Sequence, residues 1–276
     1  MDSKIIKSDW IADGIKEIWF EHSLIAKKFL PGQFLVIHQS KKSERIPLTI
    51  VETKGDNVRI IVQEVGYSTS QLCALGEGDI IRDVAGPLGQ PTHFENYGTV
   101  VCVAGGIGAA PLRPVAQGYK DAGNKLVIIE GVRCEDLLIL EDELEDIADD
   151  FILVSDDGSL GQKALVTKPF KDLLDSGVVP GMTYAVGPPV MMHAVSKITI
   201  ERGIPLMVSL NPVMVDGTGM CGSCRVEVGG ETKFACVDGP EFDGNKVDYK
   251  LLMSRLRMYE KEEKVLGKEH RSCGSS

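Results

Sequence analysis

Residues 99–112 read TVVCVAGGIGAAPL, and this stretch decides the class of fold. After Thr99, residues 100–104 are a continuous apolar run, which is typical of a strand buried on both faces of a parallel sheet. A glycine-rich turn and a helix-like segment follow, and a second apolar run comes at residues 125–129, so the stretch predicts a βαβ unit. Apolar runs at residues 151–154 and 183–186 extend the sheet, and we expect a Rossmann-like α/β domain over residues 98–206.

The segments on either side of this domain have different patterns. Before it, short β-rich runs such as residues 34–37 and 58–62 alternate with Gly, Pro, Asn and Asp, which predicts a small antiparallel β-barrel over residues 1–97. After it come a Cys/Gly-rich module at residues 207–247 and a C-terminal helix and tail at residues 248–276.

The composition is that of an ordinary globular protein. The chain has 276 residues, 43% of them apolar and 25% charged, which fits two domains and a small third module. Its net charge of −10 argues against a nucleic-acid or anionic-membrane partner, because like charges repel. The sequence has neither a secretion signal at its start nor 18 consecutive apolar residues, so we expect it in the cytoplasm. We interpret the acidic run at residues 141–150 as one exposed helix face.

The strongest chemical signal is the spacing D-x4-C-x2-C-x11-C, formed by Asp216, Cys221, Cys224 and Cys236. It matches the plant-type pattern of 2Fe-2S clusters, with an aspartate in place of the first cysteine. In a reducing compartment, three cysteines crowded into one segment indicate metal ligation before disulfides. A zinc site is the alternative, although the second ligand pair that zinc ribbons and fingers use is missing.

Three turns of the α/β domain are candidates for binding a dinucleotide. Residues 105–109, GGIGA, bring bare backbone and a helix N-terminus close to a pyrophosphate, although such turns also occur for packing alone. Residues 155–159, SDDGS, follow a strand where such folds contact the adenosine ribose, and their acidic side chains favour NADH over NADPH. Gly187 and Pro188 end a later strand at the ligand-binding edge, with a plain turn as the alternative.

Two motifs in the predicted barrel suit a flavin. Residues 45–50, RIPLTI, place the hydroxyl of Thr49 among apolar residues, where it would hydrogen-bond a flavin ring. Gly66, Ser68 and Thr69 supply hydroxyl and N–H groups at a predicted helix start, which suits a flavin diphosphate. Taken alone, the two motifs also fit an ordinary strand and a helix N-cap.

Together these motifs resemble the ferredoxin reductase superfamily, and within it the branch with a C-terminal 2Fe-2S module. That branch includes the electron-transfer subunits of dihydroorotate dehydrogenases. It also includes the small (alpha) subunits of NADH-dependent reduced ferredoxin:NADP+ oxidoreductases, which are also described as sulfide dehydrogenase subunits. The resemblance covers nearly the whole chain, from IPLT at residues 46–49 through GPLG at residues 86–89 to CVDGP at residues 236–240.

The chain departs from the family pattern at two positions. Ile46 stands where an arginine commonly contacts the flavin phosphates, with Arg45 one place earlier. Asp216 replaces the first cysteine, which points toward the bifurcating transhydrogenase subunits and away from the dihydroorotate branch. Asp238 and Cys273 remain rival candidates for the fourth cluster ligand.

The resemblance implies a β-barrel that binds FAD, an α/β domain that binds NAD(H) and a module that holds a 2Fe-2S cluster. A flavin exchanges two electrons with NADH and single electrons with a cluster, which explains the order of the domains. The implied enzyme is an electron-bifurcating NADH-dependent ferredoxin:NADP+ oxidoreductase, whose large subunit carries a second FAD and 4Fe-4S clusters. An electron-transfer subunit of dihydroorotate dehydrogenase and a zinc-bearing interaction module without redox activity are the alternatives.

The resemblance also implies the residues of each site. Thr49 is the expected catalytic residue. The expected cofactor-binding residues are Ile46, Pro47, Leu48, Thr49, Ile61, Val62, Gln63, Gly66, Ser68, Thr69, Gly105, Gly106, Ile107, Gly108, Ala109, Arg133, Ser155, Asp156, Asp157, Gly158, Ser159, Gly187 and Pro188. The expected cluster ligands are Asp216, Cys221, Cys224 and Cys236.

Overall fold

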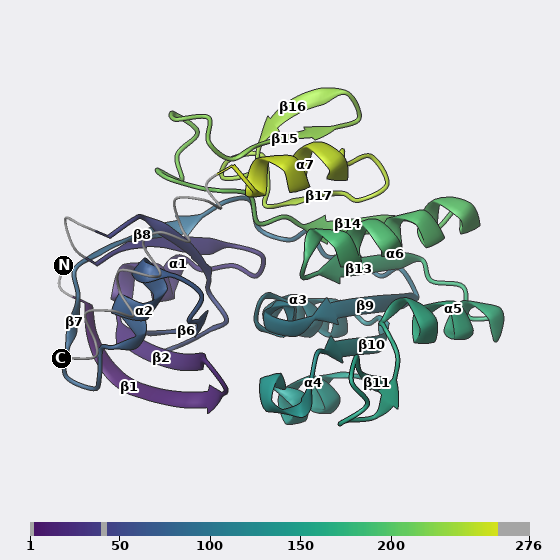
Figure 1. The fold of residues 1–276 in the computed structure, drawn as a ribbon, viewed down its shortest axis with the longest axis horizontal. Helices are drawn as coiled ribbons and strands as arrows, with labels where there is room; N and C mark the ends of the chain where they lie inside the picture. Colours follow the sequence, from purple (N-terminus) through teal and green to yellow (C-terminus); the bar gives the residue numbers. More distant parts are fainter. Residues whose placement is uncertain (1–2, 40–42, 259–276) are drawn as a thin grey trace.

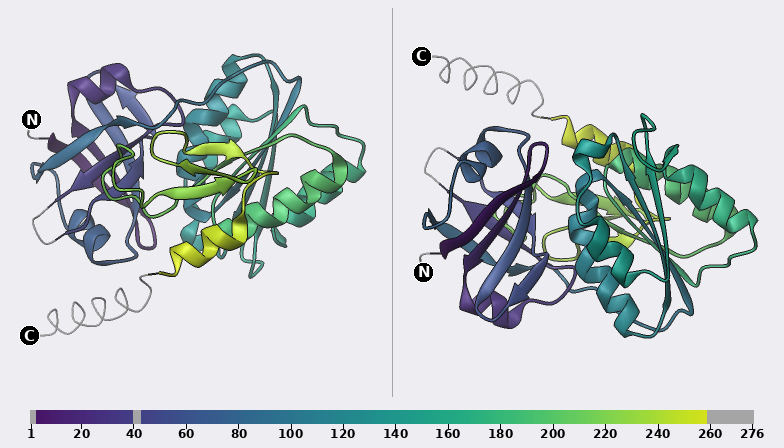
Figure 2. Two further views of the ribbon diagram at one scale, coloured as in Figure 1. Left: turned by 90° about the horizontal axis from the view of Figure 1, so that it is seen from above. Right: turned by 90° about the horizontal axis from the view of Figure 1, so that it is seen from below.

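The structure is a computed structural model and describes residues 3–39 and 43–258 (Figure 1). It contains an antiparallel β domain, a parallel sheet with helices on both faces, and a small module that lies across the junction of these two (Figures 1 and 2). The predicted fold class is confirmed. No helix within the described ranges is long and apolar enough to span a membrane. The tail that contains Cys273 lies outside the described residues.

Eight antiparallel strands and two short helices form the N-terminal domain. They are β1 (Ser3–Ala12), β2 (Ile15–Glu21), α1 (Ser23–Lys28), β3 (Phe34–His38), β4 (Ile46–Thr49), β5 (Glu52–Lys54), β6 (Asn57–Gln63), α2 (Tyr67–Cys73), β7 (Ile80–Ile81) and β8 (Asp83–Leu88). One sheet has the order β5-β6-β2-β1-β7 and the other the order β4-β3-β8. Side chains of both sheets, among them Ile18, Leu35 and Ile60, are fully buried in one shared core.

The second domain is a doubly covered sheet of seven strands in the order β12-β11-β10-β9-β13-β14-β17, parallel except for the last. The strands are β9 (Thr99–Gly105), β10 (Lys125–Val132), β11 (Asp150–Ser155), β12 (Gln162–Lys163), β13 (Met182–Val186), β14 (Leu206–Ser209) and β17 (Glu241–Asp243). The chain moves from β9 outward to β12 and then returns to β13 on the other side of β9. This reversal is a topological switch point, where open sheets bind ligands.

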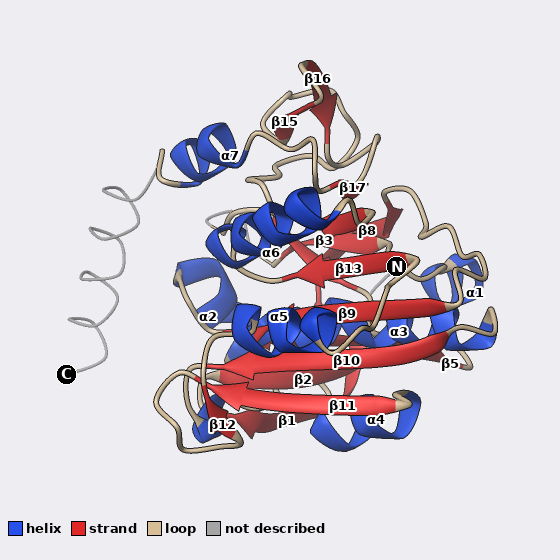
Figure 3. Ribbon diagram, turned by 90° about the vertical axis from the view of Figure 1, so that its right-hand side faces the viewer, coloured by secondary structure: helices blue, strands red, loops and turns tan. Residues whose placement is uncertain are grey.

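Four α-helices cover the two faces of this sheet. They are α3 (Ala109–Asp121), α4 (Glu141–Ile147), α5 (Thr167–Asp175) and α6 (Pro189–Arg202), with short turns η1 (Gly106–Gly108) and η2 (Glu135–Leu137). The helices α3 and α4 share a core with one face of the sheet, and α5 and α6 share a core with the other. Figure 3 shows α5 and α6 in front of the aligned strands.

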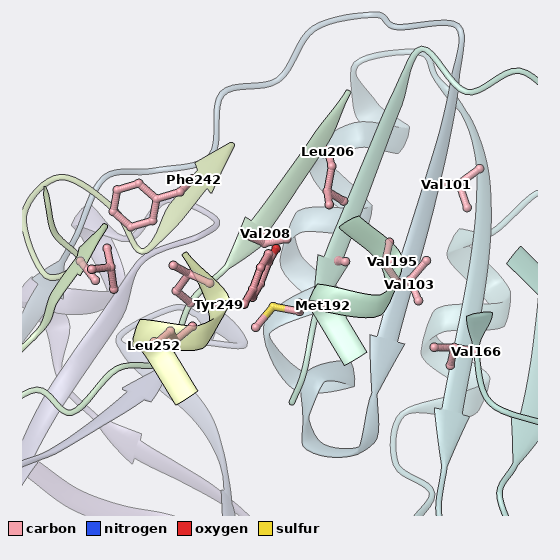
Figure 4. Packing of buried hydrophobic residues seen from close by; sticks show 14 of the residues in the cluster. Val101, Val103, Val166, Met192, Val195, Leu206, Val208, Phe242, Tyr249 and Leu252 are labelled. Atoms are coloured by element: carbon pink, nitrogen blue, oxygen red, sulfur yellow. The ribbon is translucent and has the colours of Figure 1, made fainter. Parts of the chain in front are cut away.

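The cysteine-rich module is joined to the parallel sheet instead of standing apart from it. Its hairpin is β15 (Arg225–Val228) and β16 (Glu231–Phe234), followed by β17 and by α7 (Tyr249–Leu256). Because β17 pairs with β14, the open edge of the sheet is covered, and Tyr249 and Leu252 of α7 join the core beside α6 (Figure 4). The predicted domain boundary after residue 206 therefore falls within β14.

The acidic run at residues 141–150 is only partly an exposed helix face. Helix α4 ends at Ile147, because the carboxylate of Asp149 accepts the N–H of Leu126 and Asp150 begins β11. Asp142, Glu145 and Asp146 are exposed as predicted. The interpretation is wrong for Glu143, which is bonded to arginines of both domains.

A buried contact ties the linker between the domains to the module. The carboxylate oxygen Oε1 of Glu241 accepts hydrogen bonds of 2.8 Å from the hydroxyls of Thr92, in the linker, and Tyr184, in β13. Gln90 adds two bonds from the linker, one from its N–H to the carbonyl of Gly239 and one from its side chain to the carbonyl of Val237. Burial raises the pKa of Glu241, so both hydroxyl donors matter for holding its charge.

Glu130 is a second buried carboxyl group, in the middle of the α/β domain. It lies on β10 beside Ala104 of β9, is fully buried, and neither of its oxygens has a hydrogen-bond partner among the described residues. Burial, and to a smaller extent Glu141, raises its pKa to about 8. Glu130 is therefore a neutral carboxylic acid in the folded protein at pH 7.

This burial predicts that Glu130→Gln stabilises the protein at high pH. A carboxyl group whose pKa is about 8 when folded and 4.5 when unfolded binds its proton more tightly in the folded state, so stability falls as pH rises from about 4.5 to about 8. Glutamine keeps the shape without a proton to lose. The free energy of unfolding of the variant minus that of the parent should be larger at pH 8 than at pH 5, by on the order of 2 to 4 kcal/mol. Urea unfolding at both pH values measures it, with exposed Asp142→Asn as the control; equal pH dependence of parent and variant would contradict the assignment.

Candidate functional site

The carboxyl ends of four parallel strands bring the predicted dinucleotide residues together. Gly105 at the end of β9 pairs with Gly131 of β10, Val132 of β10 pairs with Ser155 of β11, and Val186 of β13 pairs with Ala104. The turns at residues 105–109, 155–159 and 187–188 therefore share one edge of the sheet. The exposed Arg133 follows β10 at the same edge.

The glycines of the first turn differ in purpose. A Cβ on Gly108 would lie 2.4 Å from the carbonyl oxygen of Val186, and one on Gly105 would lie 2.6 Å from Sδ of Met191, so both allow close packing of β9 against β13 and α6. Gly106 has φ +54° and no atom within 4 Å of the Cβ position. The open backbone at Gly106 and the N-terminus of α3 are suited to an anion, because helix N–H groups and the helix dipole favour negative charge.

The turn at residues 155–159 is held by its own side chains. The hydroxyl of Ser155 is buried and bonds both the N–H and the carbonyl of Leu160, so it faces away from a ligand. Asp157 accepts the N–H and hydroxyl of Ser159, which lower its pKa, and Asp156 is exposed. The aliphatic part of the Lys163 side chain lies 3.1 to 3.4 Å from the Cβ position of Gly158 and so packs against the turn.

The predicted flavin strand β4 is half-buried along its whole length. Thr49 lies opposite Phe34 of β3, and its hydroxyl makes no hydrogen bond within the described part of the chain. Ile61 and Val62 of β6 have buried side chains, so only their main chain is available to a ligand. A strand surface with a free hydroxyl fits the edge of a flavin ring, which carries both hydrogen-bond donors and acceptors.

The hydroxyls at the start of α2 bond to their own chain. Thr69 Oγ1 accepts the N–H groups of Val65 and Gly66, and Ser68 Oγ accepts the N–H of Glu44. The structure thus shows the N-cap that was the alternative interpretation of this segment. In these bonds the Ser68 hydroxyl is an acceptor and keeps its O–H as a donor, whereas Thr69 Oγ1 donates to the carbonyl of Gly66. Arg45, the nearest basic residue to the strand motif, is exposed.

The four predicted cluster ligands lie in two pairs. Cys224 and Cys236 are buried with their Sγ atoms 3.2 Å apart. Asp216 Oδ2 accepts the N–H of Cys221 at 2.8 Å, which holds this carboxylate beside the exposed Cys221. No three such side chains converge on one point within the described ranges. A two-iron cluster takes two protein ligands on each iron, so this donor set of three thiols and one carboxylate fits it.

Hydrogen bonds prepare one pair for metal binding more than the other. The N–H of Thr218 lowers the pKa of Asp216, and hydrogen bonds from Ser223 lower that of Cys221, which favours their charged forms. Burial, together with the neighbouring Cys224, raises the pKa of Cys236 to about 12. The rival Asp238 accepts the N–H of Phe234 at 2.6 Å and so closes its own turn.

The cluster loop rests on the flavin strand's neighbour. Gly217, next to Asp216, has φ +77°, and a Cβ there would lie 2.7 Å from Leu88 of β8 and 3.2 Å from Val36 of β3. Val36 pairs directly with Pro47 of the flavin motif. The predicted cluster loop is therefore one strand away from the predicted flavin strand.

Comparison with known proteins agrees with this arrangement. Residues 102–197 match the family described as oxidoreductase NAD-binding domain, and residues 211–248 match the iron-sulfur cluster binding domain of dihydroorotate dehydrogenase B. A *Thermotoga maritima* protein named as a homologue of the dihydroorotate dehydrogenase B (NAD(+)) electron transfer subunit is 46% identical over 265 residues, 95% of this chain and 93% of the relative. The chain belongs to the family of dihydroorotate dehydrogenase B electron transfer subunits and their homologues.

Other members and a solved structure extend the family. The probable electron transfer subunit of *Methanocaldococcus jannaschii* is 35% identical, covering 80% of this chain and 82% of that one. The structure of an NADH-dependent reduced ferredoxin-NADP oxidoreductase, studied for flavin-based electron bifurcation, matches with a TM-score of 0.91 and 44% identity over 97% of both chains. The predicted family is confirmed, and this electron transfer subunit is an oxidoreductase with NAD-binding and iron-sulfur domains.

Some residues that shape the site gave no signal in the sequence. Gln90 bonds to Val237, 147 residues later in the chain, and Glu241 accepts from Thr92, 149 residues earlier. Val36 lies near Gly217 only in the folded chain. None belongs to a motif with regular spacing. The glycines in the cluster loop were the one visible hint, because a left-handed backbone requires them.

The packing of the dinucleotide turn predicts unequal effects of alanine in this electron transfer subunit. Gly108→Ala forces the main chain of β13 to move and should destabilise the protein by about 1 to 3 kcal/mol. Gly106→Ala meets open space and should cost only about 1 kcal/mol for its left-handed backbone. Urea unfolding of the two variants decides it. A larger loss of unfolding free energy for Gly106→Ala than for Gly108→Ala would contradict the close packing of Gly108 against β13.

Proposed function

We propose that this chain takes hydride from NADH onto FAD and passes the electrons singly through a 2Fe-2S cluster to a large partner subunit. The observation that carries the proposal is the contact of the cluster loop, at Gly217, with Val36, which pairs with the flavin strand at Pro47. FAD, when bound, exchanges two electrons with a nicotinamide and one at a time with a 2Fe-2S cluster. Both carriers would then lie next to each other within one chain.

The roles of individual residues follow from where they lie. Thr49 would donate or accept the hydrogen bond at the flavin ring, with Ile46, Pro47 and Leu48 covering its edge. The main chain of residues 61–63 would approach from β6, in the other sheet of the barrel. N–H groups near Gly66, Ser68 and Thr69 would face the flavin diphosphate. We assign this role to main-chain N–H groups because Thr69 Oγ1 donates its proton to the carbonyl of Gly66, and the Ser68 hydroxyl accepts the N–H of Glu44.

The dinucleotide residues would act mainly through backbone and charge. Residues 105–109 would hold the pyrophosphate, and Gly187 and Pro188 would border the nicotinamide. Arg133 and residues 155–159 would surround the adenosine ribose, with the Asp157 carboxylate ionised at neutral pH. Asp216 and Cys221 would bind one iron, and Cys224 and Cys236 the other.

The exposed end of the cluster loop is the face we assign to the partner. Met220 is 89% exposed beside Cys221, and a cavity of about 150 Å³ lies next to them, lined by Arg225, Arg255 and Met258 among others. The family resemblance implies that the large subunit would carry a second FAD and 4Fe-4S clusters in an electron-bifurcating ferredoxin/NADH/NADP+ transhydrogenase, and the solved relative was studied for flavin-based electron bifurcation. We place the complex in the cytoplasm, where the free cysteines of the described chain would stay reduced.

Service to dihydroorotate dehydrogenase is the second candidate. The names of several relatives and the description of the matched cluster domain favour it. The aspartate at position 216 favours the transhydrogenase. Purification of the native complex, with assays for dihydroorotate oxidation and for NADP+ reduction by ferredoxin and NADH, separates the two functions.

The acidic ribose turn predicts a preference for NADH. The subunit reconstituted with FAD is mixed anaerobically with NADH or NADPH, and the loss of flavin absorbance is followed. We expect at least tenfold faster reduction by NADH, because a 2′-phosphate beside ionised carboxylates loses about 1.4 kcal/mol or more. Asp156→Asn should narrow the preference, whereas Asp146→Asn, exposed on α4, should not. Equal or faster reduction by NADPH would sink the assignment.

The pairing of Asp216 with Cys221 predicts that Asp216 is the fourth cluster ligand. Asp216→Cys should keep a cluster with a shifted potential and a changed EPR spectrum, because thiolate shares more electron density than carboxylate. Asp216→Ala should lose iron, while Asp238→Asn and Cys273→Ala should keep it. Iron content and visible absorbance measure the outcome, and zinc in a colourless protein would support the non-redox alternative. Full iron in Asp216→Ala with iron loss in Cys273→Ala would make the tail cysteine the ligand.

A further inference from the structure

A buried arginine connects the two large domains. Arg59 lies on β6 of the barrel with only 8% of its side chain exposed. Its Nε donates to Oε2 of Glu17 at 2.6 Å, and its two terminal nitrogens donate to both carboxylate oxygens of Glu143 at 3.0 and 2.8 Å. Glu143 belongs to α4 of the α/β domain. The Arg59–Glu143 contact is therefore a bidentate pair that crosses the domain junction.

A second arginine completes the cluster from the opposite side. Arg113 of α3 donates from Nε to Oε2 of Glu143 at 3.0 Å and lies 3.8 Å from Oε1 of Glu52, on β5. Glu52 also accepts from Arg59 at 3.2 Å. Each domain thus supplies both an acid and a base to the contact. Although burial opposes its ionisation, the bonds and charge of Arg59 lower the pKa of Glu143, so the pair is charged at neutral pH.

The surrounding apolar contact does not define one orientation. Ile15, Val51 and Ile61 of the barrel share a core with Ala109 and Ala110 of α3, and such packing is non-directional. An open surface cleft of about 320 Å³ lies at this place, lined by Arg59 itself, Ile11 and residues 138–143. The planar, two-point contacts of the arginines are directional, so they restrict rotation where the apolar core does not.

The group of Arg59, Arg113 and Glu143 includes a residue of α3, the helix that begins at the dinucleotide turn. Arg113 lies on α3 five residues after Gly108, about one and a half helical turns from the turn itself. Arg59 lies on β6, which contacts the proposed flavin strand β4. We propose that Arg59, Arg113 and Glu143 are positioning residues that set the distance between the nicotinamide and the flavin. The inference rests on the proposed function of the two domains, and none of the three residues is among those we assign to cofactor binding.

The first test compares two glutamines on one helix. Glu143→Gln removes the interdomain charge, and Glu145→Gln removes an exposed charge from the same helix. In the FAD-loaded subunit, Glu143→Gln should slow the limiting rate of flavin reduction at saturating NADH by roughly tenfold to a hundredfold, with the NADH concentration for half-saturation nearly unchanged. Glu145→Gln should match the parent. Equal slowing by both variants would mean a general charge effect and overturn the proposal.

The second test measures coupling. Arg113→Gln should slow flavin reduction as Glu143→Gln does. The double variant should be no slower than the slower single variant, because both substitutions remove the same Arg113–Glu143 contact. Multiplied effects would overturn the cluster as a unit. Arg113→Lys, which keeps the charge and loses the planar fork, should restore only part of the rate. If Glu143→Gln does not fold, the Arg113 variants carry the same comparison.

A third readout does not depend on the cofactors. Amide hydrogen exchange of the cofactor-free chain should be faster in β6 and α4 of Glu143→Gln than in the parent or Glu145→Gln, because the junction opens more often. Faster exchange with an unchanged reduction rate, or unchanged exchange in both elements, overturns the positioning role. Lack of any flavin reduction by NADH in the parent would instead reject the proposed function. Hydrogen exchange in β6 and α4 would still test whether Glu143 stabilises the contact between the domains.

Discussion

At the switch point of the parallel sheet, the ends of β9 and β13 lie so close that only backbone fits between them. The Cβ position of Gly108 is 2.4 Å from the carbonyl of Val186, and that of Gly187 is 2.9 Å from the carbonyl of Gly105. This constraint turns the end of β9 into a bare turn and sends α3 back along the sheet. Ala109 and Ala110 in the first turn of α3 share a core with Ile15 and Val51 of the barrel, and the open backbone at Gly106 just before them favours an anion.

The same sheet also places the cysteine module. An unpaired β14 would leave a row of open N–H and carbonyl groups, and β17 pairs with it. That pairing brings Glu241 to the hydroxyls of Thr92 and Tyr184 and brings the turn after Cys236 to Gln90. As a result, the Asp216 end of the loop meets the barrel at Leu88 and Val36. Strand pairing thus brings the loop at Gly217 next to the strand that pairs with Pro47.

The carboxyl groups at the domain junction are paired with arginines, whereas the buried Glu130 is held neutral. The chain carries a net charge of −10, yet its arginines at the domain junction are enclosed by carboxylates from both domains. Glu130, by contrast, is buried without a partner and is held neutral by burial. Removing a partner from the enclosed pairs would leave an uncompensated charge, whereas replacing the neutral Glu130 by glutamine leaves no charge behind.

Local patterns in the sequence predicted the central strands β9, β10, β11 and β13, barrel strands such as β3 and β6, and the glycine turn, but not β12, β14 or β17. These features depend on neighbours within a few residues, which propensity, hydrophobic period and motif spacing describe. The fates of individual polar groups were decided by the tertiary structure: Ser155, Ser68 and Thr69 bond to their own chain, Glu143 turns inward, and β17 crosses to β14. Each depends on partners far along the chain or on competition between donors. A sequence pattern contains neither the distance nor the burial that settles such competition.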